Sequence, residues 1–357
     1  MNIMSEKVLM KGNEAMAEAA IMAGCHHYFG YPITPQTEVA AYMSKRLPKI
    51  EGGVFLQAES EIAAINMVIG VSSTGKRVMT SSSSPGISLK SEGISYLAGC
   101  DLPALVVNVQ RGGPGLGGIQ PSQSDYFQAT RGGGHGDYHM IVLAPASVQE
   151  MASLVFKGFD LADKYRMTSM ILADGTMGQM MEPVSLDMGE VTKYDKPWAL
   201  TGTKCERKPN IVNSLFLKPE ELEVFNDNRF KKYEVVEKNE VMYEEYKTED
   251  ADICIVAFGV AARVSQNAVD EARKRGIKVG MIRPITLWPF PKEVLLKTAD
   301  KVKAFISVEL NKGQMIEDVE LATRCRKPVL FCGRSGGMIP TVENVLDAIA
   351  EADKIGG

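Results

Sequence analysis

Strand-like and helix-like segments alternate along residues 12–178, and this alternation constrains the fold more than any other feature of the chain. Residues 54–57 form a short apolar segment, and residues 59–69 after it have helical spacing. Residues 104–109 are apolar except for Asn108, as in a strand that is covered on both faces. Strands that alternate with helices of this length form a parallel, doubly wound sheet. The sequence therefore predicts an α/β fold for its first half.

The pattern changes after residue 181 and resumes near residue 251. Prolines punctuate a polar stretch, and residues 218–250 are dense in charge with acidic residues in excess. Apolar residues recur there at near-helical spacing, which predicts a solvated connecting helix. We therefore expect two doubly wound α/β domains, at 1–181 and 251–357, joined by a linker with an acidic helix at 182–250.

Charge and hydropathy exclude several classes of protein. The 357 residues carry 40 Lys and Arg against 44 Asp and Glu, a formal charge of −4, which argues against nucleic acid as the main partner. Apolar stretches break well before the roughly 20 residues of a membrane span. Residues 1–12 lack the apolar core of a signal peptide. We expect a cytoplasmic protein that binds neither nucleic acid nor a membrane.

The six cysteines are scattered, and the closest pair, Cys325 and Cys332, lies seven positions apart. Iron–sulfur clusters and structural zinc sites use closely spaced cysteines. We therefore expect no metal or cluster in this chain.

A glycine pattern, Gly113-x-Gly115-x-x-Gly118, follows a predicted strand and matches the dinucleotide-binding fingerprint. Pro114 and the lack of an acidic residue about 20 positions later weaken the match. A flexible active-site loop would explain the glycines equally well. A non-catalytic α/β protein that binds NAD or another small ligand therefore stays open as an alternative.

Three segments place polar groups at the carboxyl ends of predicted strands, the edge where open α/β sheets bind ligands. They are 30–37, 57–64 and 81–86. In the first, we expect Pro35 at the first position of a helix that Thr34 caps.

The second segment places Glu59 and Glu61 in the first turn of a helix. Glu61 precedes the apolar residues 62–64, and an apolar wall suits a carboxyl group that shares a proton with a base. Both carboxylates could instead merely complement the helix dipole.

Six motifs follow one another over nearly the whole length: Gly30-Tyr-Pro-Ile-Thr-Pro, Gln57-Ala-Glu-Ser-Glu, Gln110-Arg-Gly-Gly-Pro-Gly, Gln123-Ser-Asp, Val308-Glu-Leu-Asn-x-Gly-Gln-Met and Gly333-Arg-Ser-Gly-Gly. In these motifs and in their order, the chain resembles the alpha-type subunit of 2-oxoacid:ferredoxin oxidoreductases. The chain looks most like the type that acts on 3-methyl-2-oxobutanoate (2-oxoisovalerate). The 2-oxoglutarate type is the alternative.

The resemblance implies a role for particular residues. The first domain would hold the pyrimidine half of thiamine diphosphate, and Glu61 would be the catalytic acid that hydrogen-bonds the ring atom N1′. Thr34 and Arg111 would bind the 2-oxoacid, because a guanidinium suits a carboxylate. The remaining cofactor-binding residues would be Tyr31, Ile33, Ser84, Pro85 and Gly86.

The resemblance also implies partners. The family converts a 2-oxoacid and coenzyme A to an acyl-CoA and CO₂, and passes the electrons to ferredoxin. A beta-type subunit would hold the magnesium ion, the diphosphate and an iron–sulfur cluster, with gamma and delta subunits in larger assemblies. The G-D-G motif of a diphosphate site has no match here, since Ala173-Asp174-Gly175 and 136–138 come nearest and neither fits. The second domain resembles the transketolase C-terminal type, and a hetero-oligomer is expected.

Overall fold

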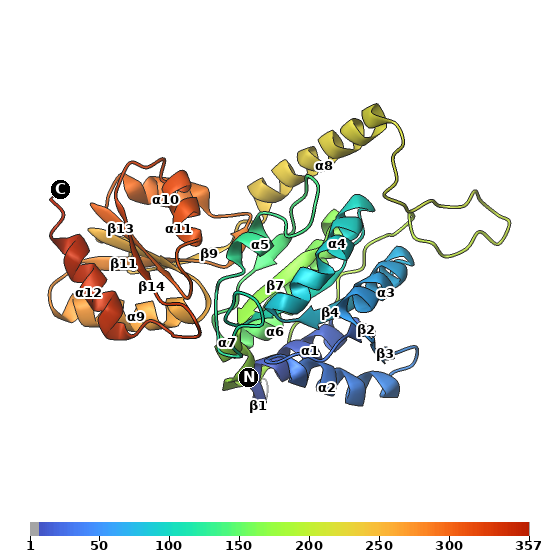
Figure 1. Ribbon diagram of the computed structural model, residues 1–357, viewed down its shortest axis with the longest axis horizontal. Coiled ribbons are helices and arrows are strands. Elements are labelled where there is room, and N and C mark those ends of the chain that lie inside the picture. The colour runs from blue at the N-terminus through green and yellow to red at the C-terminus, as the bar shows by residue number, and fades with distance from the viewer. Residues whose placement is uncertain (1–6, 357) are drawn as a thin grey trace, which may run out of the picture.

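The structure is a computed structural model and describes residues 7–356 (Figure 1). Within these residues, the larger of the sheets has seven strands. Their order is β12-β6-β7-β5-β4-β2-β3, and neighbours pair in parallel except β12, which is antiparallel to β6. The strands span Thr286–Trp288 (β12), Ile141–Leu143 (β6), Ser169–Asp174 (β7), Leu105–Gln110 (β5), Val78–Ser82 (β4), His27–Gly30 (β2) and Val54–Gln57 (β3). The predicted parallel, doubly wound sheet is confirmed.

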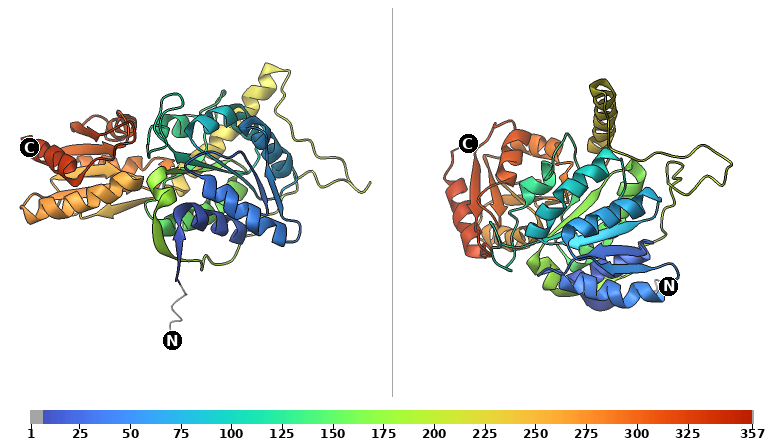
Figure 2. Two further views of the ribbon diagram at one scale, coloured as in Figure 1. Left: turned by 60° about the horizontal axis from the view of Figure 1, so that its bottom comes forward. Right: turned by 45° about the vertical axis from the view of Figure 1, so that its right-hand side comes forward.

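Helices cover both faces of this sheet (Figures 1 and 2). On one face α1 (Gly12–Met22) packs against α2 (Thr37–Arg46) and α6 (Val148–Tyr165), and on the other α3 (Glu61–Ser73) packs against α4 (Ser84–Gly99). All residues of β4, β5 and β7 are buried, as apolar central strands require. The short helices α5 (Tyr126–Thr130) and α7 (Gly175–Gln179) follow β5 and β7.

The second sheet has five strands in the order β14-β13-β10-β11-β9, and only β9 is antiparallel to its neighbour. The strands span Val329–Gly333 (β14), Ala304–Glu309 (β13), Ile253–Ala257 (β10), Val279–Pro284 (β11) and Tyr243–Tyr246 (β9). Helices α9 (Gly259–Lys274) and α12 (Val342–Asp353) pack together, as do α10 (Lys292–Ala299) and α11 (Met315–Ala322). A separate pair joins β1 (Lys7–Lys11) to β8 (Met181–Ser185).

Two strands cross the expected division of the chain. β9 lies within residues 182–250 yet extends the second sheet, and β12 lies beyond residue 251 yet pairs with β6 of the first sheet. These pairings tie the two halves together through backbone hydrogen bonds. The boundaries at 181 and 251 are kept as a proposal.

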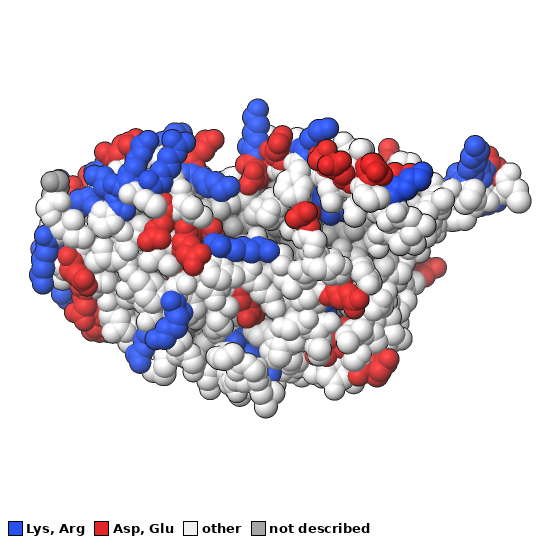
Figure 3. Space-filling view, turned by 45° about the horizontal axis from the view of Figure 1, so that its top comes forward, with Lys and Arg blue, Asp and Glu red and all other residues white. Residues whose placement is uncertain are grey.

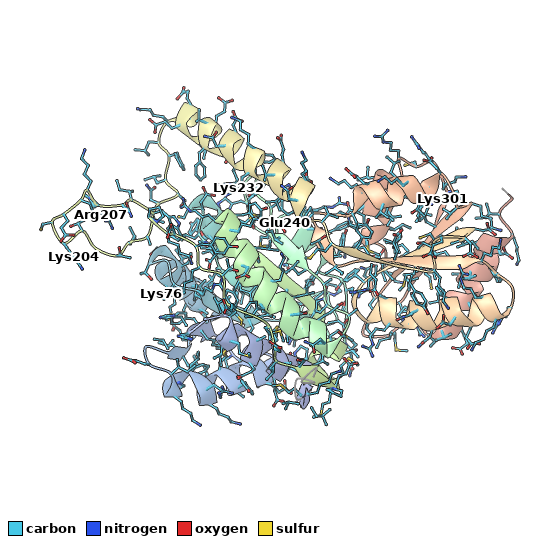
Figure 4. The ribbon with its side chains drawn as sticks, turned by 180° about the vertical axis from the view of Figure 1, so that it is seen from behind. Lys76, Lys204, Arg207, Lys232, Glu240 and Lys301 are labelled. Carbon is cyan, nitrogen blue, oxygen red and sulfur yellow. The ribbon has the colours of Figure 1, made fainter. Side chains whose placement is uncertain are left out.

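A long loop, residues 186–218, leaves the body and leads into α8 (Pro219–Asn239). Figure 4 shows Lys204 and Arg207 on the part of this loop that stands away from the rest of the protein. The Leu200 amide anchors the loop by donating to the Ser73 carbonyl oxygen at 2.8 Å. α8 buries Tyr233 against the body and exposes much of its other surface, as a solvated helix does.

The predicted start of α2 is wrong. Pro35 does not open the helix and Thr34 does not cap it, because the helix begins at Thr37 after Gln36. The amide of Gln36 donates to the Ile33 carbonyl oxygen at 3.2 Å, which closes a turn before the helix. Glu59 also lies outside α3, which begins at Glu61.

Within residues 7–356, no helix combines the length and the apolar character that crossing a membrane requires. Figure 3 shows one face of the molecule, on which Lys and Arg gather over the C-terminal half and charged side chains are sparse in the middle.

Candidate functional site

The residues singled out from the sequence lie along the carboxyl edge of β2, β3, β4 and β5, beside the first turns of α3 and α4. Glu61 is the first residue of α3, and the Ser60 hydroxyl caps this helix by accepting from the Ala63 amide at 3.1 Å. The cap fixes the backbone at Glu61 and therefore fixes where its side chain starts.

The carboxylate of Glu61 lies against α4. Glu61 is 6% exposed, and among the described residues no donor lies within hydrogen-bond distance of its carboxylate oxygens. A Cβ built on Gly86 would lie 2.7 Å from Glu61 Oε1 and closer still to Ser82 Oγ. The Ser82 hydroxyl is buried without a hydrogen-bond partner. Glycine at position 86 thus leaves room for the carboxylate beside an unpaired hydroxyl.

Ser84 connects this region to Arg111 and Asp125. The Ser84 hydroxyl donates to Asp125 Oδ2 at 2.6 Å and accepts from the Arg111 amide at 3.0 Å. Its own amide donates to Asn108 Oδ1 at 3.1 Å. The first turn of α4 is therefore held to the end of β5 by a polar network.

Arg111 bridges two loops. Its guanidinium donates to the carbonyl oxygens of Thr34 at 3.0 Å and Leu116 at 3.3 Å, and its Nε is buried without a partner. The side chain is nearly buried, so this N–H group is a hydrogen-bond donor that lacks an acceptor. The structure thus brings Arg111 into contact with the backbone of Thr34.

The other predicted residues lie around this network. Tyr31 is 38% exposed, Ile33 and Pro85 are half-buried, and Ser84 and Gly86 are buried. Tyr31 and Ile33 belong to the loop that Arg111 holds, and the last three belong to the first turn of α4.

Sequence reasoning missed Asp125 and Asn108 as parts of the site. The Asn108 amide group donates to Asp125 Oδ2 at 2.8 Å, and the Asp125 amide donates to Gln110 Oε1 at 3.0 Å. Burial raises the pKa of Asp125, although the hydrogen bonds from Ser84 and Asn108 act in the opposite direction. The motif Gln123-Ser-Asp contained Asp125, but its partners lie on β5 and at the start of α4.

A second buried group underlies the loop of Thr34. The Ser81 hydroxyl donates to Gln36 Oε1 at 2.5 Å and lies 2.7 Å from the Tyr28 hydroxyl. Burial raises the pKa of Tyr28 to about 12, so this phenol stays neutral. The buried Gln36 explains why the chain turns here instead of starting a helix at Pro35.

A cleft of about 770 Å³ opens beside Ser84 between the two halves of the protein. Its walls include Gly113, Ser124, Asp125, Lys312 and Ser335. The glycine loop forms one wall, and Leu116 in it is 83% exposed. No helix opens in this loop, because α5 starts only at Tyr126. The glycines therefore lack the helix N-terminus on which a dinucleotide phosphate would sit.

The motifs beyond the cleft join the two halves. Glu309 accepts from the amides of Gln314, Met315 and Ile316 and thereby caps α11. Gln123 donates to the Phe258 carbonyl oxygen at 2.9 Å and accepts from the Leu310 amide at 3.1 Å. These residues have a structural explanation.

Asp174 also has structural partners. One carboxylate oxygen caps α7 through the Thr176 and Met177 amides, and the other accepts from the Val260 amide at 3.2 Å. No group of three or more His, Cys, Asp or Glu that could hold a metal occurs in residues 7–356.

Two family models match the chain. The model described as pyruvate flavodoxin/ferredoxin oxidoreductase, thiamine diphosphate-binding, matches residues 18–262. The model of pyruvate:ferredoxin oxidoreductase core domain II matches residues 251–345.

Curated relatives match over nearly their full length. Ketoisovalerate oxidoreductase subunit VorB of Methanothermobacter marburgensis is 52% identical over 344 residues, which cover 96% of this chain and 97% of the relative. 2-Oxoglutarate synthase subunit KorA of Methanocaldococcus jannaschii is 36% identical, with 95% and 98% covered.

Solved structures agree with the fold. A 2-oxoglutarate:ferredoxin oxidoreductase from Magnetococcus marinus, with 2-oxoglutarate, coenzyme A and succinyl-CoA bound, superposes with a TM-score of 0.86 at 30% identity. The match covers 98% of this chain but only 65% of that one. A split-gene transketolase matches at 15% identity with a TM-score of 0.61, a likeness of fold alone.

Proposed function

Because this chain belongs to the pyruvate flavodoxin/ferredoxin oxidoreductase family, we propose that it is the alpha-type subunit of an enzyme that oxidatively decarboxylates 3-methyl-2-oxobutanoate (ketoisovalerate). The products are the acyl-CoA and CO₂, and ferredoxin takes the electrons. The family is that of the thiamine diphosphate-dependent 2-oxoacid:ferredoxin oxidoreductases. The substrate, the roles of individual residues and the division of labour between subunits belong to the proposal.

The observation that carries the proposal is the buried carboxylate of Glu61, which has no hydrogen-bond donor among the described residues. Glycine at position 86 lets this carboxylate lie beside the unpaired Ser82 hydroxyl, and these two polar groups suit a polar ring. Thiamine diphosphate, when bound, supplies the electron sink for cleavage next to the 2-oxo carbon. Glu61 would hold a proton at its carboxylate and share it with the pyrimidine ring of that cofactor.

The remaining residues bind the substrate and shape the pocket. Arg111 receives the carboxylate of the 2-oxoacid through its guanidinium, whose Nε has no other partner, and Thr34 positions it from the opposite loop. The cofactor is further enclosed by Tyr31, Ile33, Ser84, Pro85 and Gly86. The polar network of Ser84 and Asp125 keeps the pocket wall in place before substrate arrives.

This chain provides half of the active site. Asp174 already caps α7 and contacts α9, so it does not stand ready for magnesium. A beta-type subunit therefore supplies the magnesium and diphosphate site and an iron–sulfur cluster, and gamma and delta subunits complete larger assemblies. The complex acts in the cytoplasm and meets coenzyme A and ferredoxin there.

An apolar surface next to Glu61 suits the beta-type subunit. Ile62, the residue after Glu61, is 50% exposed, and Leu89 on α4 and Leu56 on β3 are exposed as well. Large apolar side chains exposed together mark interaction surfaces. Docking there would close the cofactor between the two subunits and exclude water from the reacting centre.

2-Oxoglutarate is the second candidate substrate, and one observation favours it. Lys312 lines the cleft beside Ser84, where it could meet a second carboxylate. Two other cations are engaged elsewhere: Arg131 pairs with Asp318 at 3.3 Å, and Lys90 is buried behind Glu61.

The test is to purify the complex anaerobically from its host and measure ferredoxin reduction with each 2-oxoacid. We expect higher kcat/KM for 3-methyl-2-oxobutanoate than for 2-oxoglutarate. Glu61→Gln should abolish turnover while the subunits still co-purify. An active Glu61→Gln complex would overturn the role of Glu61, and a preference for 2-oxoglutarate would overturn the substrate.

A further inference from the structure

Lys90 is a fully buried lysine that the proposed chemistry does not use. It lies on α4 four residues after Gly86, so both project from the same face of the helix. Its ammonium donates one long hydrogen bond, 3.4 Å, to the backbone carbonyl oxygen of Glu61. No carboxylate lies within ion-pair distance of it in residues 7–356.

The position is unfavourable for a cation in two ways. Burial removes the ammonium from water, and this desolvation lowers the pKa of Lys90 to about 8, with the charge of Glu61 acting in the opposite direction. The first turn of α3 also presents the positive end of its helix dipole to Lys90. The charge of the Glu61 carboxylate and the long hydrogen bond to the Glu61 carbonyl oxygen offset these effects.

Close contacts on both sides of Lys90 prevent the two helices from moving closer together around this pair. A Cβ built on Gly93 would lie 2.5 Å from Ile65 Cγ2, so α3 and α4 are in close contact one turn beyond Lys90. At the other end Gly86 touches the Glu61 carboxylate. Lys90 is therefore held between α3 and α4, against the backbone of Glu61.

We propose that Lys90 is a positioning residue whose positive charge holds the Glu61 carboxylate in place for the cofactor. The inference rests on the proposed function, because Glu61 must have a partner on the open side. Lys90 acts only through Glu61 and touches neither substrate nor cofactor. A buried charge that costs stability is retained because the reaction needs it, as expected where stability and activity conflict.

Coupling between the two residues is measurable without the cofactor. We expect Lys90→Met to raise the Tm of the full-length chain at pH 7 by several degrees. Glu61→Gln should lower Tm, because it leaves Lys90 buried without a counter-charge. In the Lys90→Met background, Glu61→Gln should have little effect on Tm. Equal shifts in both backgrounds would show no coupling and would overturn the proposal.

The second readout is the kinetics of the assembled complex. Lys90→Met should lower kcat at least tenfold and leave KM for the 2-oxoacid within twofold. A more stable but slower enzyme is a result that a purely structural lysine would not give. A kcat within twofold of the wild type would overturn the proposal.

Lys90→Gln is the matched variant, because its amide can still donate to the Glu61 carbonyl oxygen but carries no charge. We expect the same loss of kcat as for Lys90→Met. If Lys90→Gln recovered kcat, the hydrogen bond and not the positive charge would position Glu61, and the proposal would be overturned. The proposed function fails separately, if Glu61→Gln alone retains turnover.

Discussion

The guanidinium of Arg111, at the end of β5, donates to the backbone carbonyl oxygen of Thr34, in the loop after β2. The two residues lie 77 positions apart and follow strands that do not pair with each other. One side chain thus ties the loop of Thr34 to the glycine loop, whose Leu116 carbonyl oxygen it also contacts. Both walls of the proposed substrate site depend on it.

Replacing Arg111 with Met should therefore lower kcat/KM for the 2-oxoacid by about 100-fold, because charge-assisted hydrogen bonds contribute about 1.5–3 kcal/mol. Arg111→Lys should recover only part of this, since an ammonium lacks the planar fork. Steady-state kinetics of the complex measures both. Arg131→Met is the control, because Arg131 makes an exposed ion pair with Glu317 and should change kcat/KM less than twofold. An unchanged Arg111→Met enzyme would contradict the assignment.

Gly86→Ala should weaken thiamine diphosphate binding and lower stability. The added Cβ would sit 2.7 Å from Glu61 Oε1 and force the carboxylate out of position. We expect at least a tenfold weaker affinity, measured by cofactor titration of the complex, and a lower Tm.

Gly70→Ala is the control for this change. Gly70 lies in α3 with nothing within 4 Å of a built Cβ, so alanine should stabilise the helix by about 0.5–1 kcal/mol. The prediction fails if the two alanine variants bind the cofactor equally well.

The helix that carries Glu61 followed from the local spacing of its apolar residues. Its start was predicted at residue 59, whereas α3 begins at Glu61 after the Ser60 cap. The turn at Thr34 could not be found in this way, because Gln36 is held by Ser81, 45 positions away. A local rule that puts proline at a helix start therefore gave the wrong boundary.

Other features depend on contacts that sequence patterns do not encode. Composition rules place lysine at the surface, so a buried Lys90 has no sequence signal. The chain returns to the first sheet after about 140 residues, where β12 pairs with β6. No periodicity in the sequence predicts this pairing. The alternation of strands and helices, in contrast, depends on local spacing, and it predicted the parallel sheets.

Stability should depend on pH through Lys90. The pKa of Lys90 is about 8 in the folded chain, against an ordinary value of 10.5, so the unfolded chain holds this proton over an interval in which the folded chain has lost it. The free energy of unfolding should therefore rise as pH increases from 8 to 10.5. The full effect is about 3 kcal/mol, at 1.36 kcal/mol for each pKa unit.

Urea titrations of the wild type and Lys90→Met at pH 7 and pH 10 test this dependence. The difference between the two proteins isolates Lys90 from other groups, such as Tyr28, which titrate at high pH. Lys90→Met should be the more stable protein at pH 7, and the difference should shrink by pH 10. A difference that stays constant with pH would rule out Lys90 as its source.

We expect the beta-type subunit to dock on the exposed apolar surface beside Glu61. Ile62→Asp should weaken association with the beta-type subunit at least tenfold, because docking would bury an unpaired carboxylate. The Tm of the free chain should change by less than about 2 °C, since half of this side chain already faces water and substitutions at exposed positions stay within about 0.5 kcal/mol. Leu321→Asp is the control: Leu321 is exposed on α11, in the other half of the protein, and its loss should leave association unchanged. Co-purification at several salt concentrations measures both, and equal effects would mean that the surface of Ile62 is not where the partner docks.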